Sequence, residues 1–410
     1  MEDVLTFLFL LALFLYHRLK KEPDYSFKSW LKQSPVQKKD TLLKKKIIAI
    51  VNPKSGNGNG AVIATLLHDI CNHFGFTLTC VYTAKSGHAH ELASVLDASY
   101  DLCVCISGGG MLNEVVNGIL SNQNTSGRHS SSLPLSDSFH HNVIACFPLF
   151  QMKTKLSLLI VPVGTGNGVA SNLGCNTAFD ALNGLLCENE IDVDLFEAQV
   201  GHGFHTHGVL SISWGLVADI DAQSESSGRW MGNARTLLLP IYHMLRNAHY
   251  EGALEFRLAP NGPEPKLPSS FTRTWKKAGY GTASYSRRTA EEEEWIVVQG
   301  SFAMVTIMNL PWLANDIQLA PETPLAEGVL TLLFMTKASR MSLLGMFMAA
   351  ESGQHMNHPD LNVVQVTDVR VLPGSNNVGN VVYDGEQAPS GPFHARVIPR
   401  AATFLKGTSK

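Results

Sequence analysis

The chain has 410 residues, of which 45% are hydrophobic and only 16% are charged. This composition excludes a disordered or fibrous protein, and the length is sufficient for two domains with cores of their own. The formal net charge of -3 argues against a generally basic nucleic-acid-binding protein, so no nucleic-acid partner is expected.

The amino-terminal segment, residues 1–40, combines an apolar run with a basic flank. Val4–Tyr16 contains one polar side chain, Thr6, and ten basic residues stand against three acidic ones between His17 and Lys46. A helix of this length spans roughly 20 Å, which is less than a bilayer requires. The basic residues follow the apolar run, whereas a cleaved secretory signal would place them before it. The segment therefore predicts contact with an anionic membrane surface, and the alternative is an ordinary core or amphipathic helix.

The cysteines show neither a disulfide framework nor a zinc site. Their number is odd, and no two of them are spaced as C-x-x-C. Several lie in apolar runs, where a free thiol behaves as a small hydrophobic side chain. The cysteines are Cys71, Cys80, Cys103, Cys105, Cys146, Cys175 and Cys187. Together with the basic flank, they favour a cytoplasmic protein that associates with membranes peripherally or through its amino terminus.

The first half of the chain alternates between strand-like and helix-like patterns. Apolar runs rich in β-branched residues predict strands at Ile47–Val51, Leu78–Thr83, Leu102–Ser107 and Leu156–Val163. Helical patterns lie at Ala61–Phe74, His90–Leu96, Met111–Leu120 and Val169–Leu173. This alternation predicts an α/β domain at residues 41–190, with a Rossmann-like parallel sheet and helices on both faces. The serine-rich stretch Ser121–Ser138 is expected to be a loop.

The second half, residues 191–410, is mainly strand-like and predicts a β-rich, sandwich-like domain. The expected strands are Gly208–Ala218, Trp295–Leu310, Gly328–Met335, Leu361–Leu372, Val378–Tyr383 and Phe393–Pro399. Helices are expected at Arg229–Arg246 and Met341–Ala350. Residues 261–294 are rich in Pro, Gly, Ser and Lys, and we expect an exposed excursion there.

Three predicted strands of the first domain end in polar, glycine-rich turns. The turns are Asn52–Gly60, Ser107–Gly110 and Gly164–Gly168, and a predicted helix follows each one. Glycine lets the backbone approach a ligand closely, and a helix start offers N–H groups to an anion. Open α/β sheets bind ligands at the carboxyl ends of their strands, so the three turns together predict a nucleotide-phosphate site.

The pattern does not fit the two commonest nucleotide motifs. Gly56-x-Gly58-x-x-Ala61 matches the dinucleotide fingerprint formally, but the next strand ends at Thr83 without the acidic residue that would bind the ribose. No Gly-Lys-Ser/Thr follows the first turn, as a P-loop would require. Both NAD and P-loop chemistry are therefore disfavoured.

The three turns resemble the nucleotide-binding segments of the diacylglycerol kinase catalytic-domain superfamily. The matching residues are NPKSGNGNG at 52–60, SGGGMLNEVVNG at 107–118 and PVGTGNGVA at 162–170. Three further segments are similar to sphingosine kinases specifically: Ser211–Asp221 with Arg229–Arg235, Phe347–Met356 and Asp384–Glu386. The resemblance extends in the same order from about Lys46 to about Lys406.

The resemblance implies an ATP- and Mg²⁺-dependent lipid kinase that phosphorylates a long-chain sphingoid base. It leaves the oligomeric state open. It implies a nucleotide site formed by Asn52, Ser55, Gly56, Asn57, Gly58, Gly60, Thr83, Ser107, Gly108, Gly110, Glu114, Gly164, Thr165, Gly166, Asn167, Arg229, Arg235, Asp384, Gly385 and Glu386. Glu386 would also help to position Mg²⁺, a hard cation that prefers oxygen ligands. Asp221 would bind the polar head of the lipid, and the helices around Thr236–Leu245 and Leu343–Ala350 would line its alkyl chain.

One position departs from the family pattern. The second turn of the family reads Ser-Gly-Asp-Gly, and its Asp is the expected catalytic base; in this chain the position is Gly109. Loss of a general base typically lowers turnover by about 10²–10⁴-fold. Three readings therefore stay open: a sphingosine kinase with impaired activity, an inactive ATP- or lipid-binding protein, and a kinase of ceramide or diacylglycerol.

Overall fold

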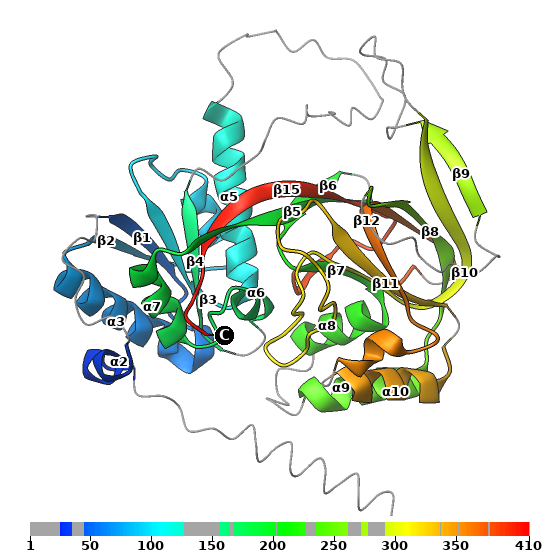
Figure 1. The fold of residues 1–410 in the computed structure, drawn as a ribbon, viewed down its shortest axis with the longest axis horizontal. Helices are drawn as coiled ribbons and strands as arrows, with labels where there is room; N and C mark the ends of the chain where they lie inside the picture. Colours follow the sequence, from blue (N-terminus) through cyan, green and yellow to red (C-terminus); the bar gives the residue numbers. More distant parts are fainter. Residues whose placement is uncertain are drawn as a thin grey trace, which may run out of the picture.

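The fold is seen in a computed structural model of the chain (Figure 1). The structure describes residues 25–34, 45–126, 156–164, 167–201, 203–226, 235–260, 272–277, 292–336, 338–350, 353–375 and 378–409. The apolar run at Val4–Tyr16 and most of its basic flank lie outside these residues. Among the helices that the structure describes, none combines the length and the apolar character needed to span a bilayer.

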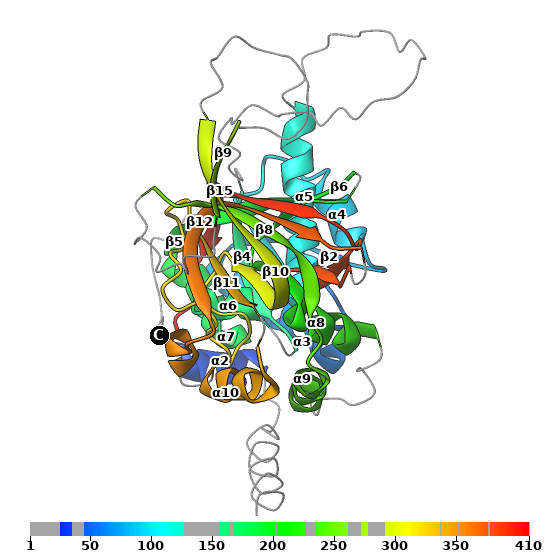
Figure 2. The same ribbon diagram turned by 90° about the vertical axis from the view of Figure 1, so that its right-hand side faces the viewer.

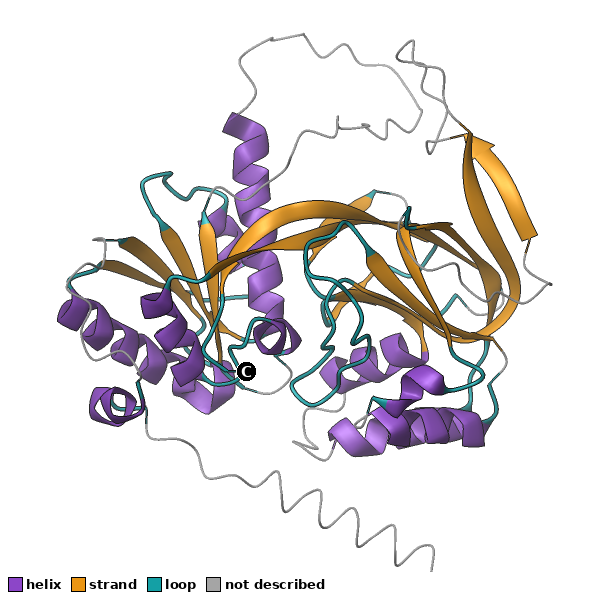
Figure 3. Ribbon diagram, in the orientation of Figure 1, coloured by secondary structure: helices purple, strands orange, loops and turns teal. Residues whose placement is uncertain are grey.

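The first half forms a parallel sheet with helices on both faces, as predicted (Figure 3). Its strands are β1 (Lys46–Val51), β2 (Thr77–Tyr82), β3 (Leu102–Ser107) and β4 (Ser157–Pro162). Its helices are α2 (Phe27–Gln33), α3 (Asn59–Phe74), α4 (His88–Ala93), α5 (Gly109–Ser126), α6 (Gly168–Asn172) and α7 (Ala178–Cys187), and a 3₁₀ turn, η1 (Ser55–Gly58), precedes α3. The helix α3 packs with α2 on one face, and α4 packs with α5 on the other.

The strand order brings the glycine-rich turns together. The strands lie in the order β4-β3-β1-β2, so β1 and β3 are neighbours, as are β3 and β4. The connection from β1 runs outward to β2, whereas the one from β3 runs outward to β4 on the other side. This reversal creates a topological switch point, where open α/β sheets bind their ligands. The carboxyl ends of β1, β3 and β4 therefore lie side by side at one edge of the sheet.

The second half is mainly antiparallel. Its strands are β5 (Glu190–Val200), β6 (Phe204–Gly208), β7 (Ser211–Gly215), β8 (Tyr250–Leu258), β9 (Thr272–Lys277), β10 (Glu292–Met308), β11 (Leu330–Thr336), β12 (Asn362–Pro373), β13 (Val381–Tyr383), β14 (Glu386–Ala388) and β15 (Phe393–Leu405). Its helices are α8 (Leu216–Ser226), α9 (Arg235–Arg246) and α10 (Arg340–Ala350), with a 3₁₀ turn, η3 (Gln354–Asn357), after α10. The apolar side chains of these strands form a second core that includes Trp214, Phe256 and Phe334.

Two long strands join the halves into one hydrogen-bonded sheet. The strand β15 pairs with β12 near its start and meets β4 at Phe404, opposite Leu158. Along most of its length it pairs with β5, which leads out of the first half. Figures 1 and 2 show β5 and β15 running from the parallel sheet into the antiparallel one. The parallel sheet and the second half of the chain are thus joined by backbone hydrogen bonds, with one irregularity in the β5–β15 pairing between Ile398 and Ala402.

Several local expectations were wrong. Gly208–Ala218 was expected to be one strand, but β7 ends at Gly215, where φ is 87°, and α8 begins at Leu216. The exposed excursion expected at residues 261–294 stays a prediction, and its described part includes the strand β9, which pairs with the start of β10. The segment Ser121–Ser126 continues α5 rather than starting a loop. The strands β5, β6 and β8 and the helices α2 and α7 were not predicted. In β5 and β8 polar side chains interrupt the apolar pattern, and pairing with other strands stabilises both of them.

Candidate nucleotide and lipid site

The first and third glycine-rich turns contact each other directly. The Ser55 hydroxyl donates a hydrogen bond of 3.1 Å to the Val163 carbonyl. Gly56 has a φ of 56°, and a side chain there would lie 2.7 Å from Val163 Cγ1 and 3.0 Å from the Gly164 nitrogen. Gly164 has a φ of 101°, which glycine adopts readily. Glycine at position 56 therefore allows the close contact between the two turns, and glycine at position 164 allows the positive φ.

The second turn, Ser107–Gly110, leads into α5. Gly108 lies beside the third turn, because a side chain at this position would be 3.7 Å from Asn167 Oδ1. A Cβ atom at Gly109 would meet no atom within 4 Å. One at Gly110 would overlap the Glu386 carboxylate. The helix α5 therefore begins with open space at position 109 and a carboxylate from the second domain against position 110.

Glu114 anchors the neighbouring turn. Its carboxylate accepts hydrogen bonds from the backbone nitrogens of Gly87 (2.8 Å) and Ala89 (3.1 Å), at the start of α4. This segment follows Thr83, whose backbone nitrogen bonds to the Val51 carbonyl at 2.9 Å. The geometry gives Glu114 a supporting role, since its carboxylate holds the turn after β2.

Asp384 links the second domain to α5. Its buried carboxylate accepts hydrogen bonds from the backbone nitrogens of Val209, Leu210 and Ser211, at 2.7 to 3.0 Å. A fourth comes from Asn113 Nδ2 on α5, at 2.8 Å. Asp384 and Gly385 both have positive φ, as the two central residues of a tight β-hairpin require. Asp384 thus fixes the β13–β14 hairpin that carries Glu386.

The polar groups around this link are buried. Burial raises the pKa of Asp384, and its four hydrogen-bond donors act in the opposite direction. Burial lowers the pKa of His207 to about 4, so this imidazole is neutral at neutral pH. The His207 backbone nitrogen donates to Asn117 Oδ1 at 2.9 Å, and its carbonyl accepts from Asn113 and Asn117. These bonds fix α5 against β6.

The helix α8 presents two acidic residues of different character. Asp221, the predicted lipid-head residue, is half-buried. Asp219 is buried and accepts hydrogen bonds from the Tyr250 hydroxyl and from Asn380 Nδ2. Two residues along a helix correspond to a rotation of about 200°, so the two carboxylates leave α8 on opposite sides.

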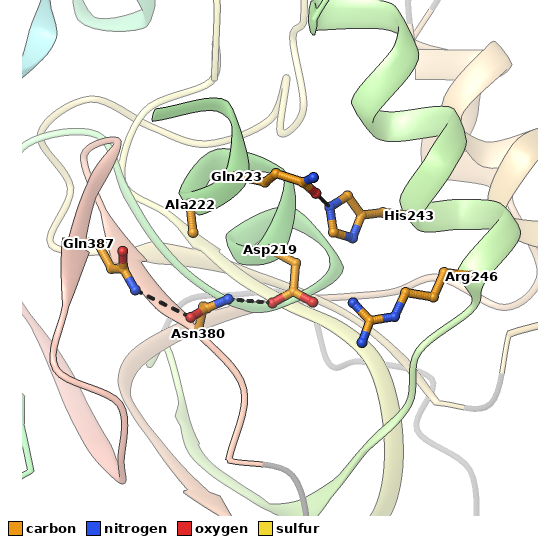
Figure 4. A pocket seen from close by; sticks show the side chains of 7 residues that line it. All are labelled: Asp219, Ala222, Gln223, His243, Arg246, Asn380 and Gln387. Atoms are coloured by element: carbon orange, nitrogen blue, oxygen red, sulfur yellow. Dashed lines mark hydrogen bonds between the residues drawn. The ribbon is translucent and has the colours of Figure 1, made fainter. Parts of the chain in front are cut away.

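Asp219 lines a polar cavity of about 270 Å³ between α8, α9 and the β13–β14 hairpin (Figure 4). His243 lies on the α9 side, where its Nε2 is 2.6 Å from Gln223 Oε1. Figure 4 shows Arg246 extending toward Asp219. The sequence patterns gave no reason to single out Asp219, because its partners Tyr250 and Asn380 are distant in the chain.

The helices α8, α9 and α10 pack around one apolar cluster. Its buried members include Leu216 on α8, Met244 on α9 and Leu343 and Met346 on α10. These contacts form a structural core between the three helices, and the prediction that α9 and α10 line an alkyl chain stays a prediction.

Part of the predicted site lies outside the described residues. Thr165, Gly166 and Arg229 belong to this group, as do the side chains of Asn57 and Arg235. Among the described residues, no cluster of three His, Cys, Asp or Glu side chains could hold a metal ion. Mg²⁺ needs fewer protein ligands when phosphate oxygens complete its shell, and the Glu386 carboxylate beside the turn fits that requirement.

Comparisons with known proteins agree with this architecture. Residues 46–198 match the diacylglycerol kinase catalytic domain, and residues 278–406 match the YegS C-terminal NAD kinase beta sandwich-like domain. A solved diacylglycerol kinase structure from Bacillus anthracis str. Sterne shares the fold, with a TM-score of 0.55 and 14% sequence identity. The match covers 90% of this chain and 98% of that one.

The chain therefore contains the catalytic domain of the diacylglycerol kinase superfamily. Within it, the chain is similar to sphingosine kinase 2 of Arabidopsis thaliana, with 26% identity over 83% of this chain and 69% of that protein. It is also similar to the ceramide kinase of Mus musculus, with 25% identity over 73% of this chain and 57% of that protein.

The contact between α3 and the first turn yields a stability prediction. A side chain at Gly60 would overlap the Asn52 carbonyl, a backbone group that cannot rotate away. Gly60→Ala is expected to lower the free energy of unfolding by about 1–3 kcal/mol, as overpacking does. Gly109→Ala is the matched control, because its added methyl group enters open space. Urea denaturation of both variants checks this, and equal midpoints would contradict the close contact.

Proposed function

We propose that the protein is a lipid kinase that transfers the γ-phosphate of ATP to the primary hydroxyl of sphingosine or a related long-chain base. The convergence of the three glycine-rich turns carries this proposal. Ser55 and Gly56 of the first turn contact Val163 and Gly164, and Gly108 of the second turn lies beside Asn167. Such a cradle suits a polyphosphate, because backbone N–H groups can approach its oxygens without intervening side chains.

The residues around the cradle have separate tasks in phosphoryl transfer. Positioning and charge stabilisation supply most of the catalysis in this reaction. Glu386, held by the Asp384 hairpin, would bind Mg²⁺ with the nucleotide phosphates, and the bound cation would neutralise phosphate charge. Arg229 and Arg235 are proposed to bind phosphate oxygens, for which a planar and permanently charged guanidinium is suited.

The choice of lipid rests on Asp221. Its carboxylate on α8 would pair with the ammonium and hydroxyl groups of a sphingoid base, while the alkyl chain would pack near the α8–α10 cluster. Ceramide and diacylglycerol lack the ammonium charge, so a carboxylate favours them less. The similarity to a ceramide kinase keeps that lipid as the alternative substrate.

Position 109 favours a second candidate function, an inactive protein that binds ATP or lipid. Gly109 offers no base, and Glu114 is already bonded to the turn before α4. The cradle for ATP depends mainly on backbone groups, so nucleotide binding does not require a carboxylate at position 109. Binding and turnover are therefore separable in this chain.

Gly109→Asp tests the missing base. The space around position 109 accommodates the added side chain, and we expect turnover with sphingosine to rise by about 10²–10⁴-fold. The measurement is transfer of labelled phosphate from ATP to sphingosine by the purified protein. Gly109→Asn is the control, since it has the same shape without a basic group.

Each outcome of this assay separates the candidates. Activity in Gly109→Asp alone supports the inactive-protein reading of the natural chain. Substantial and equal activity in the natural protein and in Gly109→Asp refutes the role given to position 109. Absence of ATP binding in the natural protein and in Gly109→Asp would reject the nucleotide site.

Asp221→Asn tests the lipid assignment. The substitution keeps the shape of the side chain and removes its charge, so the KM for sphingosine should rise by about 10–100-fold, typical of a lost charged hydrogen bond. The KM for ATP should not change. The assay uses whichever of the natural protein and Gly109→Asp turns over, with ceramide as the uncharged comparison. An unchanged KM for sphingosine would exclude Asp221 from the head-group site.

Contact with the cytoplasmic face of a membrane completes the proposal. The apolar run at Val4–Tyr16 and its basic flank would hold the catalytic body near a lipid substrate. Removal of residues 1–21 deletes the apolar run and should reduce sedimentation with phosphatidylserine vesicles. Equal sedimentation of the shortened and full-length proteins would reject this role.

A further inference from the structure

A loop of the second domain packs on α6, the helix that follows the third glycine-rich turn. This loop, residues 311–317, follows β10 and reaches α6 in the first domain. Asn172 on α6 donates to the Trp312 carbonyl and accepts from the Trp312 backbone nitrogen, both at 2.9 Å. A side chain at Gly168 would overlap the Leu313 carbonyl, so the loop lies directly on the helix backbone.

Asn315 of the same loop contacts the turn itself, at Asn167. Its Oδ1 accepts a hydrogen bond from the Asn167 backbone nitrogen at 3.0 Å and a second from the Ser171 hydroxyl at 3.3 Å. Asn167 is the residue immediately before α6, and Ser171 is the fourth of the five residues of that helix. One side-chain atom of the second domain therefore contacts both the N-cap and the last turn of α6.

The Asn167 side chain is held in a specific orientation. It is 1% exposed, and its Nδ2 donates to the Gly164 carbonyl at 3.3 Å. Its Oδ1 is buried, has no hydrogen-bond partner among the described residues and lies beside Gly108. A buried acceptor without a partner is costly unless a ligand donates to it. A hydroxyl or amino group of a nucleotide could supply that donor.

We propose that Asn315 is a positioning residue of the nucleotide site, acting through Asn167. The inference rests on the proposed function. The helix α6 has only five residues, and so short a helix has little stability of its own. Asn315 supplies the missing restraint and keeps Asn167 Oδ1 directed to the space beside Gly108. The nucleotide site is thus completed by the domain that is proposed to bind the lipid.

Asn315→Ala tests this role through the affinity for a fluorescent ATP analogue. Loss of the two hydrogen bonds should weaken binding by about 3–12-fold, the range for modest net hydrogen bonds. Affinity for sphingosine and the thermal midpoint should change little. Gln318→Ala is the matched control, because Gln318 lies on the same connection beyond the residues that contact α6, and it should bind the analogue as the natural protein does.

A double-mutant cycle with Asn167→Ala identifies the route of the effect. If Asn315 acts through the Asn167 side chain, Asn315→Ala should weaken binding less than twofold when Asn167 is already alanine. An undiminished effect in that background would overturn the inference. Amide hydrogen exchange gives a readout that needs no ligand, since the Asn167 amide should lose protection in Asn315→Ala.

Binding of the analogue by the natural protein and by Asn315→Ala distinguishes the nucleotide function from the positioning role. If the natural protein does not bind the analogue, the proposed nucleotide function is rejected, and this inference falls with it. If the natural protein binds and Asn315→Ala binds equally well, the function stands and the positioning role is rejected.

Discussion

The buried carboxylate of Asp384 ties together the parts of the molecule on which the site depends. It accepts three backbone N–H groups from residues 209–211 and the Asn113 amide of α5. A carboxylate in this setting is stable only with a nearly complete set of donors, since burial disfavours its charge. The hairpin that carries Glu386 and the helix that begins at Gly109 are consequently held in one arrangement.

The nucleotide site that we propose draws on residues of both domains. The first domain supplies three turns of backbone, and glycine allows them to touch. The second domain supplies the Glu386 carboxylate against Gly110 and the Asn315 amide against Asn167. The pairing of β5 with β15 joins the two halves by backbone hydrogen bonds on either side of an irregularity between Ile398 and Ala402.

The region proposed to bind the lipid is built around α8. The helix α8 separates two acidic environments, because Asp219 is committed to Tyr250 and Asn380 whereas Asp221 leaves the helix on the opposite side. The apolar cluster of α8, α9 and α10 lies next to them. The sphingoid base that we propose as substrate has an ammonium group for a carboxylate and an alkyl chain for apolar side chains.

The sequence by itself determined the four parallel strands, the glycine-rich turns and the family, because β-branched runs and glycine requirements are local properties. The sequence also showed that position 109 is glycine and carries no carboxylate, because the residue type is read directly from it. Only the tertiary structure decided that Glu114 supports a turn, that Asp384 joins the halves and that Asn315 reaches Asn167. Those contacts link residues up to 271 positions apart. Hydrogen bonds over such separations arise from strand order and packing, and no local pattern encodes them.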